Sequence, residues 1–274
     1  MDTNPIILID TSYCCFYRYH ALCNWYKLAH PEEQLDECHI GENTTFMDKF
    51  HKKFVDMIKE FKKLYSTSNM IMALDGRNNW RKQLYKEYKA NRKNSSSRIG
   101  DCYIFQYLQS VIIPDLYQQF NIPSILVEEA EGDDVISVVK KDIRKQYPEK
   151  QIIIITSDTD LCQLIDDFTI IRDLKKKLLN DNLTKENLLA KDYLELKCIL
   201  GDKSDNIPPI FPKCGKKTAQ KYLINPDLLK QQLIKNEIWE ENYQLNKTLI
   251  DLDNIPLPIQ QSILHQYDNI GISM

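Results

Sequence analysis

Carboxylates gather at the ends of apolar segments in this 274-residue chain. Three such segments end at or just before aspartates, and a fourth leads into the acidic stretch EEAEGDDVI; the acids concerned are Asp10, Asp75, Glu131, Asp133, Asp134, Asp158 and Asp160. Close carboxylates repel one another, so an acidic stretch forms either a solvated helix start or a seat for divalent metal. Oxygen ligands without His or Cys favour Mg2+, with Mn2+ as a substitute, over zinc. Two such ions can hydrolyse a phosphodiester.

The segment LGDKSDNIP adds a further pair of acids, Asp202 and Asp205. Taken alone the pair is weak, because aspartate is common in turns before proline. Together with the other seven acids, it predicts the remaining ligands of a second metal site.

Basic residues are concentrated between Arg77 and Arg98, a stretch that contains eight positive residues and one acid. We expect a helix from Trp80 to Lys93, with one stripe of Lys82, Lys86, Lys89 and Lys93 and another of Arg81, Tyr85, Tyr88 and Arg92. A solvated face is the usual reading of such a run, but this one follows Asp75 directly and could meet phosphates. Setting aside the nine acids changes the net charge from −3 to +6, enough to hold nucleic acid.

The elements that must position these residues alternate between strands and helices. Apolar runs predict strands at 6–9, 70–74, 125–127, 152–155 and 168–171. Helical periodicity predicts helices between them, and the chain after the fifth strand reads as helical. This pattern predicts an α/β fold with a parallel sheet flanked by helices. Such sheets bind ligands at the carboxyl ends of their strands, where the acids lie.

Composition limits the class of protein. With 43% hydrophobic and 27% charged residues, the chain has the proportions of an ordinary soluble protein. Its eight cysteines show neither a C-x-x-C pair nor a zinc spacing, which predicts reduced thiols. The start MDTNPIILID lacks the basic region of a signal peptide, and no apolar run is long enough to span a bilayer. We therefore expect an intracellular protein without a membrane partner.

Six ordered motifs resemble the structure-specific 5′ nucleases, which include flap endonucleases, phage 5′-3′ exonucleases and the 5′ nuclease domain of bacterial DNA polymerase I. They are ILIDTS, MALDG, LYKEYKANRK, EAEGDDVI, TSDTDLCQLI and LGDKSDNIP. Each would be weak alone, but their order over most of the chain is specific. The resemblance implies a PIN-like nuclease core at 1–185, with a basic helix and an arch-like segment. A helical region with a helix-hairpin-helix element would follow at 186–274.

The resemblance also implies roles for individual residues. One metal ion would be held by Asp10, Asp75, Glu131, Asp133 and Asp134, and a second would be held or oriented by Asp158, Asp160, Asp202 and Asp205. Lys89 and Arg92 would contact the scissile phosphate, and Tyr88 matches an aromatic residue on which a terminal base stacks. The residues expected to bind DNA are Arg81, Lys82, Lys86, Tyr88, Lys93, Lys213, Gly215, Lys216 and Lys217.

Three segments depart from the family pattern or match it only in part. The hairpin, at 209–219, is one residue longer than usual and retains only one of the family's glycines, Gly215. This weakens the case for backbone phosphate binding and for a K+ ion there. Lys213, Lys216 and Lys217 would substitute by side-chain charge. NSSSRIG at 94–100 lies where relatives build an arch and reads equally well as an ordinary loop. QQSILHQY partly matches a sliding-clamp box (Gln260, Ile263, Tyr267), but an amphipathic helix explains it better.

The sequence thus predicts a stand-alone, monomeric, Mg2+-dependent 5′ nuclease for DNA with 5′ flaps, nicks or free 5′ ends, in replication, repair or recombination. One alternative is an enzyme of the same fold acting on RNA or RNA primers. Another is a silent protein that binds branched DNA, which predicts missing ligands, whereas all nine acids are present. An α/β enzyme of a different class is not supported, because the sequence contains no glycine-rich phosphate loop. Abundant Ile, Asn and Lys fit an AT-rich genome, including a viral one.

Overall fold

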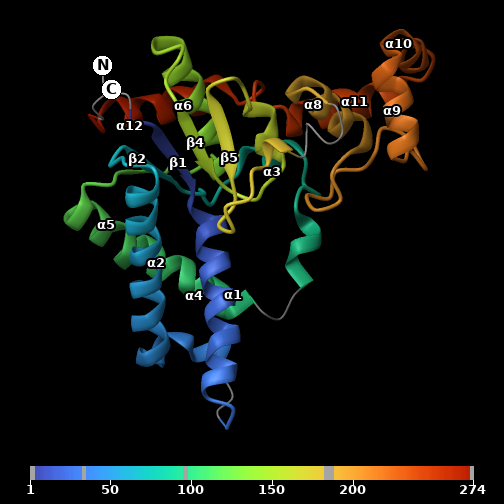
Figure 1. The fold of residues 1–274 in the computed structure, drawn as a ribbon. Helices are drawn as coiled ribbons and strands as arrows, with labels where there is room; N and C mark the ends of the chain where they lie inside the picture. Colours follow the sequence, from blue (N-terminus) through green and yellow to red (C-terminus); the bar gives the residue numbers. More distant parts are fainter. Residues whose placement is uncertain (1–3, 33–34, 95–97, 182–187, 272–274) are drawn as a thin grey trace.

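The chain folds as three layers, with a five-stranded parallel sheet between two groups of helices (Figure 1). The computed structural model describes residues 4–32, 35–94, 98–181 and 188–271. The strands lie in the order β3-β2-β1-β4-β5, which confirms the predicted α/β class. Their bounds are Ile6–Asp10 for β1, Met70–Ala73 for β2, Ser124–Ile125 for β3, Ile152–Ile155 for β4 and Thr169–Arg172 for β5.

The central strand β1 pairs with β2 on one side and β4 on the other. Ile7 and Ile9 point into one hydrophobic core, whereas Ile6 and Leu8 point into the core on the opposite face. This alternation follows from the two-residue period of a strand. Because both faces are covered, the strands read as unbroken apolar runs, and this made them recognisable in the sequence.

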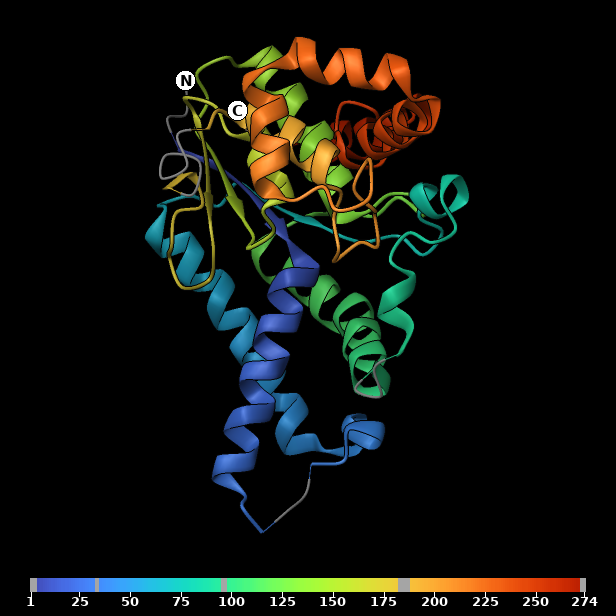
Figure 2. The same ribbon diagram turned by 90° about the vertical axis from the view of Figure 1, so that its right-hand side faces the viewer.

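One face of the sheet is covered by two long helices that project away from it together (Figures 1 and 2). They are α1, Thr11–Ala29, and α2, Thr44–Leu64, joined through the short 3-10 helix η1, Glu37–Glu42. The run α4 (Arg98–Tyr107), η3 (Leu108–Ile112, a π-helical turn) and α5 (Ile113–Phe120) packs on the same side. The residues that these elements bury are mainly apolar and aromatic, so packing holds the projecting pair to the sheet.

The other face is covered by α6, Gly132–Gln146, and by α12, Leu257–Asp268, which pack against each other. Ile263 and Tyr267 of α12 are buried in the core formed with Ile6 and Leu8. The two apolar side chains that match a sliding-clamp box, Ile263 and Tyr267, therefore lie inside the protein.

The remaining helices form a group beside the sheet (Figure 1). They are the 3-10 helix η4 (Asp160–Leu164) and the α-helices α8 (Ala190–Leu200), α9 (Lys216–Ile224), α10 (Pro226–Lys235) and α11 (Glu237–Ile250). Helices α8 to α11 share a small core of their own. The expected boundary at 185/186 falls outside the described residues and stays a prediction. Within the described ranges, no helix is both long and apolar enough to cross a membrane.

The predicted helix from Trp80 to Lys93 is wrong. Helix α3 spans only Trp80–Leu84, and Tyr85 then adopts an extended conformation. A turn follows, with Lys89 at φ 56°, before the 3-10 helix η2 at Ala90–Asn94. The Lys89 N–H donates to the carbonyl of Asp205 at 2.8 Å, so tertiary contacts override the local helical pattern. The two predicted stripes of basic and aromatic residues therefore do not exist.

Candidate metal and nucleic-acid site

Asp10 ends the central strand and caps the helix that follows it. Its Oδ1 accepts a hydrogen bond from the N–H of Tyr13 at 2.9 Å, as an N-cap residue does. Its Oδ2 accepts from the Thr156 hydroxyl, 2.7 Å away, just beyond β4. One carboxylate thus joins the ends of two neighbouring strands at the edge where a parallel sheet binds its ligands.

Asp75 lies at the same edge, just after β2. It accepts hydrogen bonds from the Ser12 hydroxyl and from the N–H of Gly132, the latter at 2.7 Å. The next residue, Gly76, is required by packing, because a Cβ there would lie 2.2 Å from the carbonyl oxygens of Val127 and Glu128. The LDG motif therefore presses the end of β2 against the acidic stretch.

Three of the acids lie where burial and neighbouring carboxylates disfavour their charged form. Burial, and then the neighbouring Asp75, raise the pKa of Asp10 to about 7. Burial together with Asp158 and Asp10 raises the pKa of Asp133 well above its usual value. Burial also raises the pKa of Asp158, although Lys197 and Lys89 oppose it. Positive charge brought to this cluster would favour the ionised form of all three.

In contrast, the surroundings of Glu131 favour its charged form. It forms an ion pair with the Lys89 ammonium and lies 3.1 Å from the Arg81 guanidinium. Burial alone would raise its pKa, but Lys89 and then Arg81 outweigh burial and lower the pKa to about 2. In this structure the side chain predicted to contact a scissile phosphate, Lys89, neutralises a predicted metal ligand.

The structure corrects the predicted roles of Arg81 and Asp134. Arg81 is 3% exposed and donates two hydrogen bonds to Asp134, at 2.8 and 2.9 Å, and one to the carbonyl of Leu249 at 2.7 Å. Asp134 is fully buried and also accepts from the indole N–H of Trp80 and from the N–H of Glu131. Arg81 therefore cannot reach nucleic acid here, and this geometry weighs against Asp134 as a direct metal ligand.

Tyr88 also differs from its predicted role. Its ring is 3% exposed and packs with Cys198, Ile207, Leu249 and Ile250. Its hydroxyl lies 2.9 Å from Glu131 and 3.1 Å from Asp205. A base cannot stack on this buried ring, so the structure assigns Tyr88 to positioning two of the acids.

Lys197, which no motif in the sequence singles out, lies among the acids expected to hold the second metal. Its ammonium pairs with Asp160 and lies 2.5 Å from Asp202. Although burial opposes the shift, Lys197 lowers the pKa of Asp202. In the sequence Lys197 is one of many lysines in a helical segment. Its spacing of five residues before Asp202 was the only available signal, and that spacing places no two side chains on one helix face.

The other predicted basic residues lie on the surface or at its edge. Arg92 is within 2.6 Å of Asp205, which places the YKANR segment against the start of the hairpin. Exposed positions include Lys82, Lys86, Lys213, Lys216 and Lys217. A side chain added at Gly215 would meet no atom within 4 Å, so its backbone is open to solvent. The side chain of Lys93 and residues 95–97 of the arch-like segment lie outside the described part.

The described acids do not form a ready-made cage of three or more metal-binding side chains. Several are held instead by protein donors, namely Glu131 by Lys89, Asp205 by Arg92, and Asp160 and Asp202 by Lys197. The donor set is nevertheless all oxygen, and the raised pKa values of Asp10, Asp133 and Asp158 show negative charge in excess of its partners. Both observations fit hard divalent cations.

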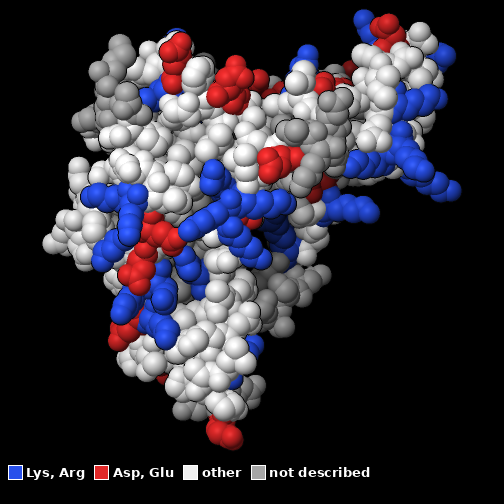
Figure 3. All heavy atoms as spheres, in the orientation of Figure 1, with Lys and Arg blue, Asp and Glu red and all other residues white. Residues whose placement is uncertain are grey.

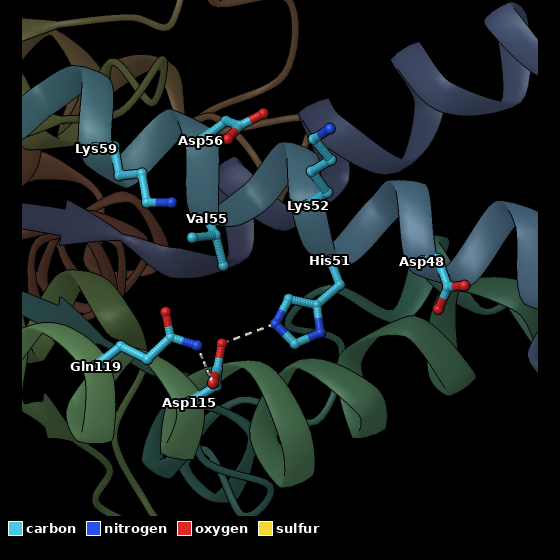
Figure 4. A pocket seen from close by; sticks show the side chains of 8 residues that line it. All are labelled: Asp48, His51, Lys52, Val55, Asp56, Lys59, Asp115 and Gln119. Atoms are coloured by element: carbon cyan, nitrogen blue, oxygen red, sulfur yellow. Dashed lines mark hydrogen bonds and ion pairs between the residues drawn. The ribbon is translucent and has the colours of Figure 1, made fainter.

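A separate cavity of about 340 Å³ lies between α2 and α5, on residues that take no part in the acidic cluster (Figure 4). His51 Nε2 lies 2.9 Å from Asp115, and Gln119 donates to the same carboxylate at 2.6 Å. His51 Nδ1 lies 3.2 Å from the hydroxyl of Tyr107. These polar groups hydrogen-bond with one another, so we interpret them as contacts that hold α2 and α5 together.

Comparison with known proteins decides the family. The sequence profile described as "5'-3' exonuclease, N-terminal resolvase-like domain" matches residues 5–192, well over half of the chain. The chain belongs to the 5′-3′ exonuclease family. This membership confirms the resemblance drawn from the six motifs, and with it the expectation of a 5′ nuclease.

Curated relatives include free-standing exonucleases and much longer polymerases. The 5′-3′ exonuclease of Buchnera aphidicola, from the pea-aphid subspecies, is 29% identical over 229 residues, or 82% of this chain and 71% of the relative. DNA polymerase I of Streptococcus pneumoniae is 27% identical over 275 residues, which cover 92% of this chain but only 29% of that polymerase. This 5′-3′ exonuclease family member thus spans less than a third of the polymerase it matches.

Solved structures support the fold of this exonuclease family member. The 5′-exonuclease of bacteriophage T5 with bound zinc ions superposes with a TM-score of 0.71 at 20% identity, over 97% of this chain and 98% of the phage protein. A phage T5 flap endonuclease in a pseudo-enzyme-product complex with DNA and metal ions gives 0.70 at 19% identity, with the same coverage. At these identities the likeness establishes the fold.

Proposed function

We propose that this 5′ nuclease hydrolyses DNA phosphodiesters at 5′ flaps, nicks and free 5′ ends, with two Mg2+ ions. The observation that carries the proposal is the cluster of Asp10, Asp133 and Asp158, whose pKa values are all raised at the carboxyl edge of the sheet. Buried like charges of this kind need cations to remain ionised. The phage T5 neighbour solved with DNA and metal ions is consistent with the same substrate class here.

The acids divide into two groups that would hold the ions. Asp10, Asp75, Glu131 and Asp133 would hold one ion, and Asp158, Asp160, Asp202 and Asp205 would hold or orient the second. When bound, a metal pair supplies a nucleophilic hydroxide at neutral pH and stabilises the leaving oxygen. Mn2+ would substitute for Mg2+, because both prefer oxygen ligands.

Lys89, Arg92 and Lys197 would act as cations that exchange partners. Each now pairs with an acid of the cluster, as Lys89 does with Glu131 and Arg92 with Asp205. Lys89 and Arg92 would pair less strongly with those acids once the acids held a divalent ion, and their side chains could then turn to a phosphate oxygen. Lys89 and Arg92 would orient the scissile phosphate and stabilise charge that develops on it.

The helix-hairpin-helix element would hold the duplex beside the cleaved strand. Helix α8, the hairpin and α9 would form the expected helix-hairpin-helix element within the region 186–274, and its residues Lys213, Lys216 and Lys217 are exposed. Lys82, Lys86 and Lys93 would extend this contact on the side of α3. A K+ ion at the hairpin would rest on the open backbone near Gly215.

The decisive test is cleavage of a labelled 5′-flap duplex by the purified protein. With Mg2+ we expect cuts near the junction, and Asp158→Asn should lower the rate at least about 100-fold while the Kd for the flap changes little. Asp167→Asn, which removes an exposed acid outside the cluster, is the matched control and should cut at the wild-type rate.

Competing DNA and RNA 5′ ends in one reaction tests the substrate class. The proposal predicts that DNA is consumed first. Preferential loss of RNA would assign the protein to the RNA-directed alternative. No cleavage of flap, nicked or single-stranded DNA or RNA with either Mg2+ or Mn2+ would contradict the proposal altogether.

A further inference from the structure

A groove between the projecting helices α1 and α2 has no part in the site described above. Its volume is about 390 Å³, and it is lined by Arg18, Ala21, Leu22 and Trp25 from α1 and by Lys49 and Lys53 from α2. Three of these six residues are cations and none is an acid. The long helices that stabilise the sheet thus also present a basic surface away from the metal-binding acids.

The cations of the groove are not neutralised by carboxylates. Among the described residues, no Asp or Glu forms an ion pair with Arg18, Lys49 or Lys53. The two acids nearest in sequence on α2, Asp48 and Asp56, line the other cavity, toward α5. Figure 3 shows Lys and Arg side chains over α2, where Asp and Glu side chains lie between them, and further Lys and Arg side chains over the centre of this face and over α9. Uncompensated positive charge in a groove attracts an anion.

The arrangement of the groove favours phosphates over bases. The one aromatic ring, Trp25, has the Lys49 ammonium 3.3 Å from its ring centre. That face of the indole is therefore covered, whereas single-strand binding needs open aromatic faces on which bases stack. Contacts to a sugar-phosphate backbone need only cations with the right spacing.

The position of the groove sets its distance from the cleavage site. Asp10 is the N-cap of helix α1, so Arg18 lies about 12 Å and Trp25 about 22 Å along the helix axis from the metal edge. A duplex rises by about 3.4 Å per base pair, so these distances span roughly four to seven base pairs. A strand leaving the metal site along α1 would bring that part of its backbone to the groove.

We propose that the groove formed by Arg18, Trp25, Lys49 and Lys53 binds the backbone phosphates of duplex DNA about four to seven base pairs from the cut phosphate. The proposal rests on the proposed function and adds a second contact surface, on the opposite side of the metal edge from the helix-hairpin-helix element. Its effect is on affinity and on the length of duplex required, with the hydrolysis step left to the acids.

The test measures binding of a fluorescent flap duplex in EDTA, so that no cleavage occurs, across a range of NaCl concentrations. The triple variant Arg18→Gln, Lys49→Gln, Lys53→Gln should bind at least about tenfold more weakly than wild type near 0.1 M salt. The slope of log K against log salt should fall by about 2 to 3. A matched triple variant, Lys145→Gln, Lys230→Gln, Lys235→Gln, removes the same charge from exposed positions on α6 and α10 and should keep the wild-type slope.

A second measurement leaves the protein unchanged. Neutral methylphosphonate linkages at base pairs four to seven should weaken binding by wild-type protein, whereas the same number of linkages beyond base pair twelve should not. An equal effect at both positions, or an unchanged salt slope in the groove variant, would overturn the proposal that the groove binds DNA. These outcomes differ from failure of the proposed function, in which wild-type protein neither binds nor cuts the flap.

Discussion

Asp10 has two roles that place opposite demands on its carboxyl group. As the N-cap of α1 it accepts a hydrogen bond that either a charged or a neutral group can accept. As a member of the acidic cluster its charge is unfavourable, because burial and Asp75 raise its pKa from 3.8 to about 7. Without metal, the folded protein therefore bears a cost at Asp10 that appears as pH rises above 3.8 and is complete above about pH 7.

This cost predicts that Asp10→Asn stabilises the metal-free protein. Asn keeps the cap and removes the charge, so in EDTA at pH 8 the Tm should rise by roughly 3 to 10 °C. The gain should shrink as pH falls, because wild-type Asp10 then becomes protonated in the folded state. Calorimetry at pH 8 and pH 5.5 measures both effects. A Tm at pH 8 that is equal to or below wild type would contradict the electrostatic account, and loss of cleavage is expected regardless.

At the scale of elements, α3 is a clamp. Its Arg81 reaches Asp134 at the start of α6 and the Leu249 carbonyl near the end of α11, so one guanidinium ties together three helices that lie far apart in the sequence. Burial by itself would lower the pKa of Arg81, but Asp134 outweighs burial and raises the pKa, so the guanidinium stays charged. The short helix thereby also sets the position of Glu131, three residues before Asp134.

Arg81→Ala should destabilise the protein by about 3 to 5 kcal/mol, because it leaves the Asp134 carboxylate buried without its partner. The neighbouring Lys82→Ala removes an exposed cation and should change the free energy of unfolding by less than about 0.5 kcal/mol. Urea denaturation of both variants measures the difference. Similar stability for the two would mean that Arg81 is not the clamp the structure depicts.

The contrast between strands and the basic segment explains what sequence could predict. The apolar runs at 6–9 and 152–155 match strands because burial on both faces leaves one pattern in the residues themselves. The positions of acids such as Asp10, at the carboxyl ends of these strands, could therefore also be predicted from the sequence. The path of 85–93 depends on the Asp205 carbonyl and on the core around Tyr88, which are more than a hundred residues away. No local pattern records such contacts, and the same is true of Lys197.

At the scale of the whole molecule, α12 completes the α/β core although it lies near the C-terminal end of the described chain. Ile263 is fully buried in the core that also contains Ile6, Leu8 and the β4 residues Ile152 and Ile154. The two core clusters on opposite faces of β1 thus depend on helices from opposite ends of the sequence. Loss of α12 would leave α6 alone to cover that face of the sheet.

Ile263→Ala should lower the free energy of unfolding by about 2 to 5 kcal/mol, through lost burial and the cavity that remains. Leu257, on the same helix but 64% exposed, provides the control, since Leu257→Ala should change stability by less than about 0.5 kcal/mol. Thermal or urea unfolding of both variants measures these changes. If the two substitutions have equal effects, α12 does not pack as described.

The central place of β1 has a consequence for how the chain folds as it is synthesised. Strand β1 leaves the ribosome before both of its partner strands, Met70–Ala73 and Ile152–Ile155, and before Ile263 of α12. Contacts of such long sequence separation form slowly, because most of the chain must be made before they can close. During that interval the apolar side chains of β1 are exposed to water, which favours aggregation of the nascent chain.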